Sequence, residues 1–282
     1  MWTLVLSLGA ASTWGVADFV GAIRARNYSA LLVAVYSEIV GLVPVLVALY
    51  FVQEAFPGWS LLPWMIVAGV AGSVGHVVFF TALARGPIGV IAPIFACSSA
   101  GPAVIAVTML GERPSIMQLG GIALAIAGVV LVSRHAGEGD IKHGKYGAVP
   151  IALIGVAILT VFYIAMDQIS QDSPLWGVTM QRTFGLPLLL IGLAIGLRRG
   201  TTTAPRGSFM AIAPVGLMDT AAFVAFAYAT SLGNLSVAVV LSSLYPVVTI
   251  LLARIKLDER LSGVQRVGAG LALLGVVAIV AG

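Results

Sequence analysis

LGERPSIMQLGGIALAIAGVVLV, at residues 110–132, is matched late in the chain by LDERLSGVQRVGAGLALLGVVAI, at residues 257–279. The match extends back without a gap, so that residues 86–132 align on 233–279 at an offset of 147, with 14 of 47 positions identical. Apolar identities are expected by chance in so apolar a sequence, and the inference therefore depends on the polar ones. These are Glu112-Arg113 with Glu259-Arg260, Ser115 with Ser262, and Gln118 with Gln265. The chain therefore contains an internal duplication, which predicts a fold of paired repeats.

The composition is that of an integral membrane protein. Of the 282 residues, 60% are hydrophobic and only 9% are charged, against about 25% charged in ordinary soluble domains. The net charge of +4 does not indicate a nucleic-acid partner, because the basic residues are scattered through short connectors between apolar runs. Cys97 is the single cysteine and lies in an apolar run, which excludes an internal disulfide and offers no metal cluster. We expect the lipid bilayer as a partner, and neither a cofactor nor a metal.

Ten segments of the chain are long and apolar enough to span a membrane, since a spanning helix needs about 20 mostly apolar residues. The first segment has no basic start and no convincing cleavage site, so we expect it to be a spanning helix and not a signal peptide. The sequence thus predicts an all-α integral membrane protein with ten transmembrane helices. They lie near residues 2–22, 30–52, 62–84, 89–111, 115–133, 146–168, 174–197, 208–231, 234–256 and 261–281.

The most polar connector, residues 134–145, separates five predicted helices from the other five. Because five is odd, the second half must enter the membrane in the opposite orientation from the first. We therefore predict two inverted five-helix repeats, at residues 1–137 and 144–282.

The basic residues are distributed unequally between the two sides of the membrane. Twelve of the 15 fall in or beside the odd-numbered connectors, whereas the even-numbered connectors carry only Arg113, and Arg182 and Arg266 lie within helices. By the positive-inside rule the odd connectors are cytoplasmic and both termini face outward, in a multi-pass protein of a bacterial-type plasma (inner) membrane. The twelve are Arg24, Arg26, Arg85, Arg134, Lys142, Lys145, Arg198, Arg199, Arg206, Arg254, Lys256 and Arg260.

Three charged residues are predicted deep in the membrane, where an ionised side chain costs roughly 2.5–3.5 kcal/mol on insertion scales. Asp219 is the deepest, near the middle of the eighth helix; Glu38 and Arg182 lie well inside the second and seventh. Aligning the two helix prolines, Pro44 and Pro187, puts Glu38 opposite Gln181. One interpretation makes Asp219 and Glu38 carboxylates that bind and release a coupling proton. The alternative is a structural ion pair of either carboxylate with Arg182.

Other polar and aromatic residues are candidates for lining a cavity. Asp18 either belongs to such a cavity or sits at the interface near Arg24, and His76, which aligns with Phe223, is either a proton carrier or a packing residue. Tyr245 precedes Pro246, which we expect to kink the ninth helix beside a substrate path. The aromatic candidates, for which ordinary packing is the alternative, are Trp14, Tyr36, Phe79, Tyr163, Phe223, Tyr228 and Tyr245.

The fifth and tenth helices carry small residues at close-packing spacings and no deep acidic residue. We expect them to be peripheral supports or the contact face of a homodimer, and the sequence leaves open whether the protein is a monomer or a homodimer. The small residues are Gly121, Ala125 and Gly128, and Gly268, Ala272 and Gly275.

Together these motifs resemble the drug/metabolite transporter superfamily, in its ten-helix EamA-type branch, over nearly the whole chain. The marks are Trp14-Gly15 with Asp18-Phe19, Ala82-Leu83, Ala227 to Ala229, and the two Leu-x-Glu-Arg closures at 110–113 and 257–260. The resemblance implies an inverted repeat with a central cavity between helices 1–4 and 6–9, helices 5 and 10 outside, and outward movement of small metabolites such as amino acids by exchange or proton coupling. Many members carry basic residues in the second connector, but residues 53–60 contain none. We therefore expect this chain to sit in the reversed orientation.

The expected function is a secondary transporter of small metabolites that alternates access around a central cavity. An uncoupled facilitator and a membrane scaffold or receptor without transport are the alternatives. An enzyme is not expected, because the sequence has no HExxH helix, no DxxxD cluster and no Ser/His/Asp set on the predicted cavity helices.

Overall fold

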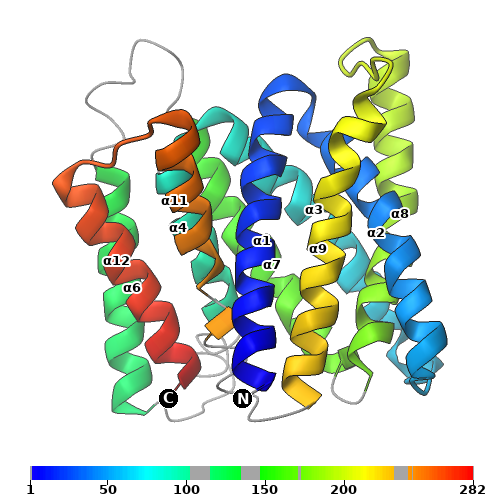
Figure 1. The fold of residues 1–282 in the computed structure, drawn as a ribbon, viewed down its shortest axis with the longest axis horizontal. Coiled ribbons are helices and arrows are strands. Elements are labelled where there is room, and N and C mark those ends of the chain that lie inside the picture. Colours follow the sequence, from blue (N-terminus) through cyan, green and yellow to red (C-terminus); the bar gives the residue numbers. More distant parts are fainter. Residues whose placement is uncertain are drawn as a thin grey trace.

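The chain is all-helical in the computed structural model, which describes residues 2–101, 115–134, 147–170, 173–231, 241–242 and 244–281. Within these ranges there is no strand, and the helices run alongside one another in a single bundle (Figure 1). The elements are α1 (Trp2–Asn27), α2 (Ala30–Val52), η1 (Trp59–Leu61), α3 (Leu62–Arg85), α4 (Ile88–Ala96), η2 (Cys97–Ala100), α6 (Ile116–Arg134), α7 (Ala148–Ser170), α8 (Pro174–Arg198), α9 (Ser208–Ser231), α11 (Tyr245–Leu257) and α12 (Gly263–Ala281).

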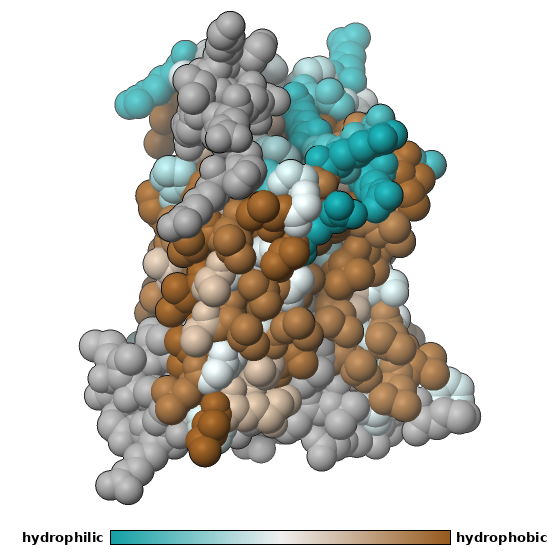
Figure 2. Space-filling view, turned by 90° about the vertical axis from the view of Figure 1, so that its left-hand side faces the viewer, coloured by the Kyte–Doolittle hydropathy of each residue, from teal (hydrophilic) through white to brown (hydrophobic). Residues whose placement is uncertain are grey.

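Seven helical segments in the described part of the chain are long and apolar enough to cross a membrane. Large apolar side chains such as Phe51 and Met210 are exposed on the outside of the bundle, where a soluble protein would carry polar groups. Figure 2 shows one such face as a broad apolar belt, with polar residues gathered near one end. The chain is therefore a membrane protein. The seven segments are Trp2–Asn27, Ala30–Val52, Trp59–Arg85, Ala148–Ser170, Pro174–Arg198, Ser208–Phe226 and Gly263–Ala281.

Helices from the two halves of the chain alternate in the bundle. α1 packs against α9 and α3 packs against α7, so in each of these pairs the two helices come from different halves of the chain. α2 contacts α8 and α9, while α8 also contacts α3. This set of pairings is unchanged when the halves are exchanged, as two copies of one scaffold require.

α6 and α12 pack mainly against each other at one side of the bundle (Figure 1). Their small residues face one another: a Cβ on Gly121 would lie 2.8 Å from the backbone oxygen of Gly275, and a Cβ on Gly128 would lie 2.6 Å from the backbone oxygen of Gly268. The small-residue stripes thus meet within one chain. These small residues are therefore used in packing α6 on α12, as a peripheral support requires, and the choice between a monomer and a homodimer stays a prediction.

The structure explains two of the polar identities that revealed the repeat. The hydroxyl of Ser115 accepts a hydrogen bond from the backbone N–H of Gln118, whose side-chain oxygen accepts one from the Ser115 N–H. Ser262 and Gln265 form the same reciprocal pair. These are capping boxes that begin α6 and α12 by satisfying N–H groups that a helix start leaves free.

The glutamate of the second Glu-Arg pair holds connectors together. Glu259 receives hydrogen bonds from Arg26 at 3.0 Å and from the backbone N–H of Gly89 at 3.4 Å. It therefore joins the connector before α12 to the end of α1 and the start of α4. Its counterpart Glu112 lies outside the described residues.

Two helices have different bounds in the structure from those predicted from the sequence. The helix expected over 89–111 begins as α4, but it changes to a 3-10 helix at Cys97–Ala100, ahead of Pro102, which has no N–H to donate. The helix expected over 234–256 is described from Tyr245, with Pro246 in its first turn. Pro246 thus lies in the first turn of α11, where its missing donor costs nothing. Residues 232–240 and 243 lie outside the described residues, so the expected kink of the ninth helix stays a prediction.

Candidate functional site

A cavity of about 200 Å³ lies in the middle of the bundle. Seven helices supply its wall: α1, α3, α4, α7, α8, α9 and the start of α11, whereas α6 and α12 supply no residue to it. The lining residues are Trp14, Asp18, His76, Phe79, Phe95, Leu159, Phe162, Tyr163, Gln181, Asp219, Phe223, Phe226, Ser242 and Tyr245.

Aromatic rings make up much of this wall and brace one another. Trp14 packs edge-on against Phe223, with ring centroids 4.9 Å apart, and lies 5.8 Å from Phe226. On another part of the wall, Phe79 packs edge-on against Phe95 at 4.8 Å. Such contacts hold the rings in place, so the cavity has a stable apolar surface.

Arg182 is buried beside the cavity and holds two carboxylates together. Its Nη1 donates to Glu38 Oε2 at 3.0 Å, and its Nη2 donates to Asp219 Oδ2 at 2.5 Å. Arg182 and Glu38 are each only 1% exposed, whereas Asp219 is 18% exposed and also lines the cavity. Both pairings that the sequence left as alternatives are therefore present at once, on one guanidinium.

Two further side chains complete the polar cluster around Glu38. Its Oε1 accepts a hydrogen bond from Gln181 Nε2 at 3.2 Å and lies 3.0 Å from His76 Nδ1. Gln181 and His76 also reach the cavity wall, so they connect the buried Glu38 with the open space. Gln181 is the residue that the aligned helix prolines place opposite Glu38. The two matched positions therefore meet across α2 and α8.

Glycines allow the helices to come close enough for these contacts. Gly41 on α2 lies against the Arg182 guanidinium, and a Cβ there would be 2.6 Å from Nη1. The Thr220 hydroxyl on α9 donates to the Gly41 carbonyl at 3.0 Å. A side chain at position 41 would push α2 away from both neighbours and open the cluster.

Asp18 lies on the cavity wall, in keeping with the first of its two sequence interpretations. Unlike Glu38 and Asp219, it makes no hydrogen bond or ion pair within the described part of the chain. An ionised carboxylate in a mostly apolar cavity without a cationic partner is energetically unfavourable, and it attracts any cation that fits.

The structure brings most of the other candidates together and leaves two apart. His76, Trp14, Tyr163 and Tyr245 line the cavity with the acidic residues. Tyr36 packs instead against Phe209, with ring centroids 5.2 Å apart. Tyr228 is 40% exposed on α9 and is not among the lining residues.

Several lining residues were not among the candidates from sequence, although helical spacing offered a signal for Phe226, Leu159 and Phe162. Asp219, Phe223 and Phe226 share one face of α9 at intervals of four and three, and Leu159 and Phe162 precede Tyr163 on one face of α7. Extending each candidate along its helix face would have found these. Phe95 on α4 and Ser242, which precedes α11, have no such signal, because no other lining residue lies on the same helix face.

No group of three or more His, Cys, Asp and Glu side chains in the described ranges is arranged to hold a metal ion. Fold and site together define a membrane protein with an internal cavity of mixed aromatic and acidic character. The chain belongs to the EamA-like transporter family, whose sequence model matches residues 1–134 and 147–281. It is therefore a small-molecule transporter.

Two comparisons agree with this assignment. The chain is 26% identical over 223 residues to the "Probable terminal-alkyne amino-acid exporter" of Streptantibioticus cattleyicolor, covering 77% of this chain and 73% of the relative. A crystal structure of a protein 18% identical in sequence has the same fold, with a TM-score of 0.64 over 98% of this chain and 94% of its own.

Proposed function

We propose that this protein is a secondary transporter that exports amino acids or closely related metabolites by alternating access around the central cavity. The single observation that carries the proposal is Asp18, a carboxylate on the largely aromatic cavity wall that has no hydrogen-bond or ion-pair partner among the described residues. The relative from Streptantibioticus cattleyicolor, an amino-acid exporter by its description, supports the same substrate class.

The charges around the cavity favour a ligand that carries a positive group. The described residues in and beside the cavity include three carboxylates, on Asp18, Glu38 and Asp219, and one guanidinium, on Arg182. While His76 is neutral, these groups together carry an excess of two negative charges. Arg182 is already shared by Glu38 and Asp219, so Asp18 is the carboxylate left to bind an ammonium group. The aromatic rings around it suit the apolar body of a small amino acid.

The size of the cavity agrees with a small substrate. At about 200 Å³ it is smaller than the roughly 300–1,000 Å³ of pockets that hold drug-sized ligands. A small amino acid suits this space better than a large drug.

Alternating access needs two halves that can exchange roles. We propose two inverted five-helix repeats, at residues 1–137 and 144–282, with ten spans in total. The exchange-symmetric pairings of α1 with α9 and α3 with α7 support this, as do the two matching capping boxes. We place the protein in a bacterial inner membrane with both termini outside, because the basic connectors lie at the opposite end.

Proton coupling through Asp219 completes the proposal. Asp219 touches the cavity on one side and Arg182 on the other, so a proton that neutralises it loosens its pair with Arg182. Glu38 would then be the carboxylate that remains paired with the guanidinium of Arg182. An uncoupled facilitator is the second candidate, and the observation that favours it is that Glu38 and Asp219 are both fixed by one arginine.

Exchange in proteoliposomes tests the substrate class. We expect the purified protein to exchange labelled apolar and aromatic amino acids but not their N-acetyl derivatives, which lack the ammonium group. Replacing Asp18 by Asn removes a charged hydrogen bond and should raise KM by about 10–100-fold. D258N, at an exposed connector position, is the matched control and should leave KM unchanged. Equal exchange of the N-acetyl derivatives, or no exchange of any amino acid, contradicts the proposal.

A second measurement separates the coupled transporter from the facilitator. Wild-type vesicles with an imposed pH gradient should accumulate substrate above equilibrium, whereas D219N should retain exchange and lose accumulation. If D219N accumulates substrate as well as the wild type, Asp219 has no coupling role. If the wild type exchanges but never accumulates, the protein is a facilitator.

A further inference from the structure

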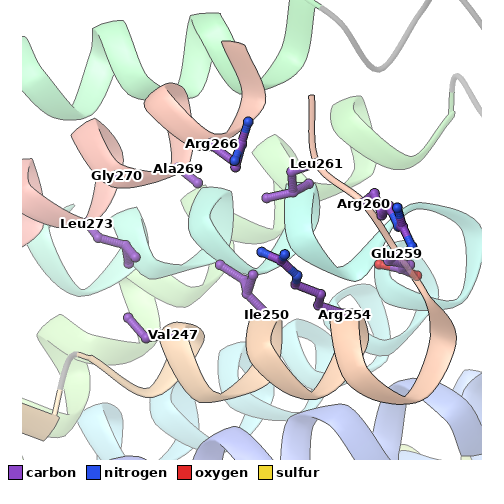
Figure 3. A pocket seen from close by; sticks show the side chains of 10 residues that line it. All are labelled: Val247, Ile250, Arg254, Glu259, Arg260, Leu261, Arg266, Ala269, Gly270 and Leu273. Atoms are coloured by element: carbon purple, nitrogen blue, oxygen red, sulfur yellow. The ribbon is translucent and has the colours of Figure 1, made fainter. Parts of the chain in front are cut away.

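A second hollow, of about 440 Å³, lies between α11 and α12 at the end of the molecule opposite the chain termini (Figure 3). It forms because α12 packs on α6 and α4, while α11 packs on α1 and α4, which leaves a groove between these two consecutive helices. The lining residues are Val247, Ile250, Arg254, Glu259, Arg260, Leu261, Arg266, Ala269, Gly270 and Leu273.

The hollow contains two arginines without a counter-charge. Arg254 comes from the last turn of α11 and Arg266 from the first turn of α12, and both side chains border the hollow in Figure 3. Neither guanidinium makes a hydrogen bond or ion pair within the described part of the chain. Glu259 is committed to Arg26, and Arg260 pairs with Asp258. The site therefore keeps an excess of positive charge.

The positive-inside rule accounts for a basic residue beside this connector, as at Arg254, but α12 itself gives no reason for Arg266. A basic residue in the first turn of a helix opposes the helix dipole, so Arg266 is unfavourable for α12. At the repeat offset of 147, Arg254 and Arg266 correspond to Val107 and Leu119. Leu119 is 52% exposed on the outside of α6. The shared scaffold is thus built with apolar residues at these positions, and the arginines are specific to the second half.

Apolar side chains continue the hollow toward the middle of the membrane. Val247, Ile250 and Leu273 lie on its wall away from the connector, as Figure 3 shows, and Val247 is exposed on the outside of the bundle. The hollow thus offers a positive end near the membrane surface and an apolar channel that opens toward the lipid. A free phosphate would pair with the arginines at the positive end but would make no contact with the apolar side chains.

We propose that this hollow is a binding site for an anionic phospholipid, whose phosphate group lies between Arg254 and Arg266 and whose acyl chain lies along Val247, Ile250 and Leu273. The charge complementarity favours this ligand over a neutral lipid, and the apolar side chains favour a lipid over a free phosphate. Binding here joins α11, which reaches the central cavity through Tyr245, to the peripheral helix α12. The site is independent of the substrate proposed for the cavity.

Native mass spectrometry of the purified full chain in detergent tests this site. Phosphatidylglycerol and phosphatidylcholine with the same acyl chains are titrated against the wild type, which should retain phosphatidylglycerol preferentially. R254Q/R266Q should lose affinity for phosphatidylglycerol by roughly fivefold for each arginine removed. R254K/R266K should keep most of the preference, and R198Q/R199Q, at an exposed pair beyond the hollow, should keep all of it.

Three results would overturn the proposal. They are equal retention of both lipids by the wild type, an equal loss of preference in R198Q/R199Q, and full displacement of the lipid by inorganic phosphate, which would make the hollow a site for small anions. Because Arg254 and Arg266 are exposed, the double variant should elute as a folded monodisperse protein. Unchanged lipid preference in that folded variant also refutes the site.

Discussion

Arg182 and Glu38 form an ion pair at 3.0 Å in which each side chain is 1% exposed, and they come from opposite halves of the chain. The desolvation of two buried charges is costly, and their mutual attraction offsets it only while the pair and its further hydrogen bonds stay intact. Asp219, Gln181 and His76 supply those further contacts. The pair thus fixes α2 against α8.

Removing Arg182 should therefore destabilise the protein severely. R182Q leaves Glu38 and Asp219 without a cation, and we expect a loss of about 3–5 kcal/mol, read as a large drop in melting temperature in detergent. R198Q, at an exposed position of the same helix, is the matched control and should melt like the wild type. The triple variant E38Q/R182Q/D219N removes the stranded charges and should melt above R182Q. Equal melting of R182Q and R198Q contradicts this account.

The contact between α6 and α12 predicts a contrast between two glycines on one helix. Gly128 abuts the backbone of α12, whereas a Cβ on Gly120 meets no atom within 4 Å. G128V should therefore cost about 1–3 kcal/mol through overpacking, while G120V should change stability little. Melting temperatures of the two variants in the same detergent measure the difference. Similar melting of both would mean that α6 and α12 separate without cost.

The sequence predicts which charged residues are buried, but not which of them form ion pairs with one another. The cost of an ion in lipid singles out Asp219, Glu38 and Arg182 in any reading of the chain. Which carboxylate pairs with Arg182 depends on the relative rotation of α2, α8 and α9, and no spacing along one helix carries that information. The aligned prolines did place Glu38 opposite Gln181, because repeat symmetry brings matched residues of crossing helices together.

The sequence could not distinguish aromatic side chains that pack between helices from those that line the cavity. Tyr36 and Tyr163 are both tyrosines in apolar helices, yet Tyr36 packs on Phe209 and Tyr163 lines the cavity. Helix periodicity fixes which residues share a face, but the direction of that face is set by tertiary packing. The cap role of Ser115 and Gln118, by contrast, was readable from their spacing.

Topology offers a direct prediction from charge distribution. The basic ends of α1, α3 and α8 lie at the end of the bundle opposite the chain termini (Figure 1), so the positive-inside rule places both termini outside. In a bacterial host, green fluorescent protein fused at the C-terminus should be dark, and alkaline phosphatase fused at the same point should be active. Bright fluorescence with an inactive phosphatase reverses the orientation.

Glu54 predicts a pH dependence of stability outside the membrane. Its carboxylate accepts hydrogen bonds from the backbone N–H groups of Leu175 at 3.0 Å and Trp176 at 3.3 Å, and so caps the start of α8 from the α2–α3 connector. Burial raises the pKa of Glu54 above its ordinary value of 4.5, against the opposing effect of those two N–H groups. The folded chain therefore holds this proton more tightly than the unfolded chain does.

For an acid with a raised pKa, the contribution to stability is complete below the unfolded pKa near 4.5 and is lost as the pH rises through the folded pKa. E54Q does not titrate at this position, so its melting temperature relative to the wild type should increase as the pH rises from acid to neutral. E54A lacks the cap and should lose about 1 kcal/mol at acid pH, and this deficit should shrink as the pH rises because E54A does not titrate at this position either. Melting curves of the three proteins across this range measure both effects. Parallel curves for E54Q and the wild type contradict the pKa shift, and equal stability of E54A and the wild type contradicts the cap.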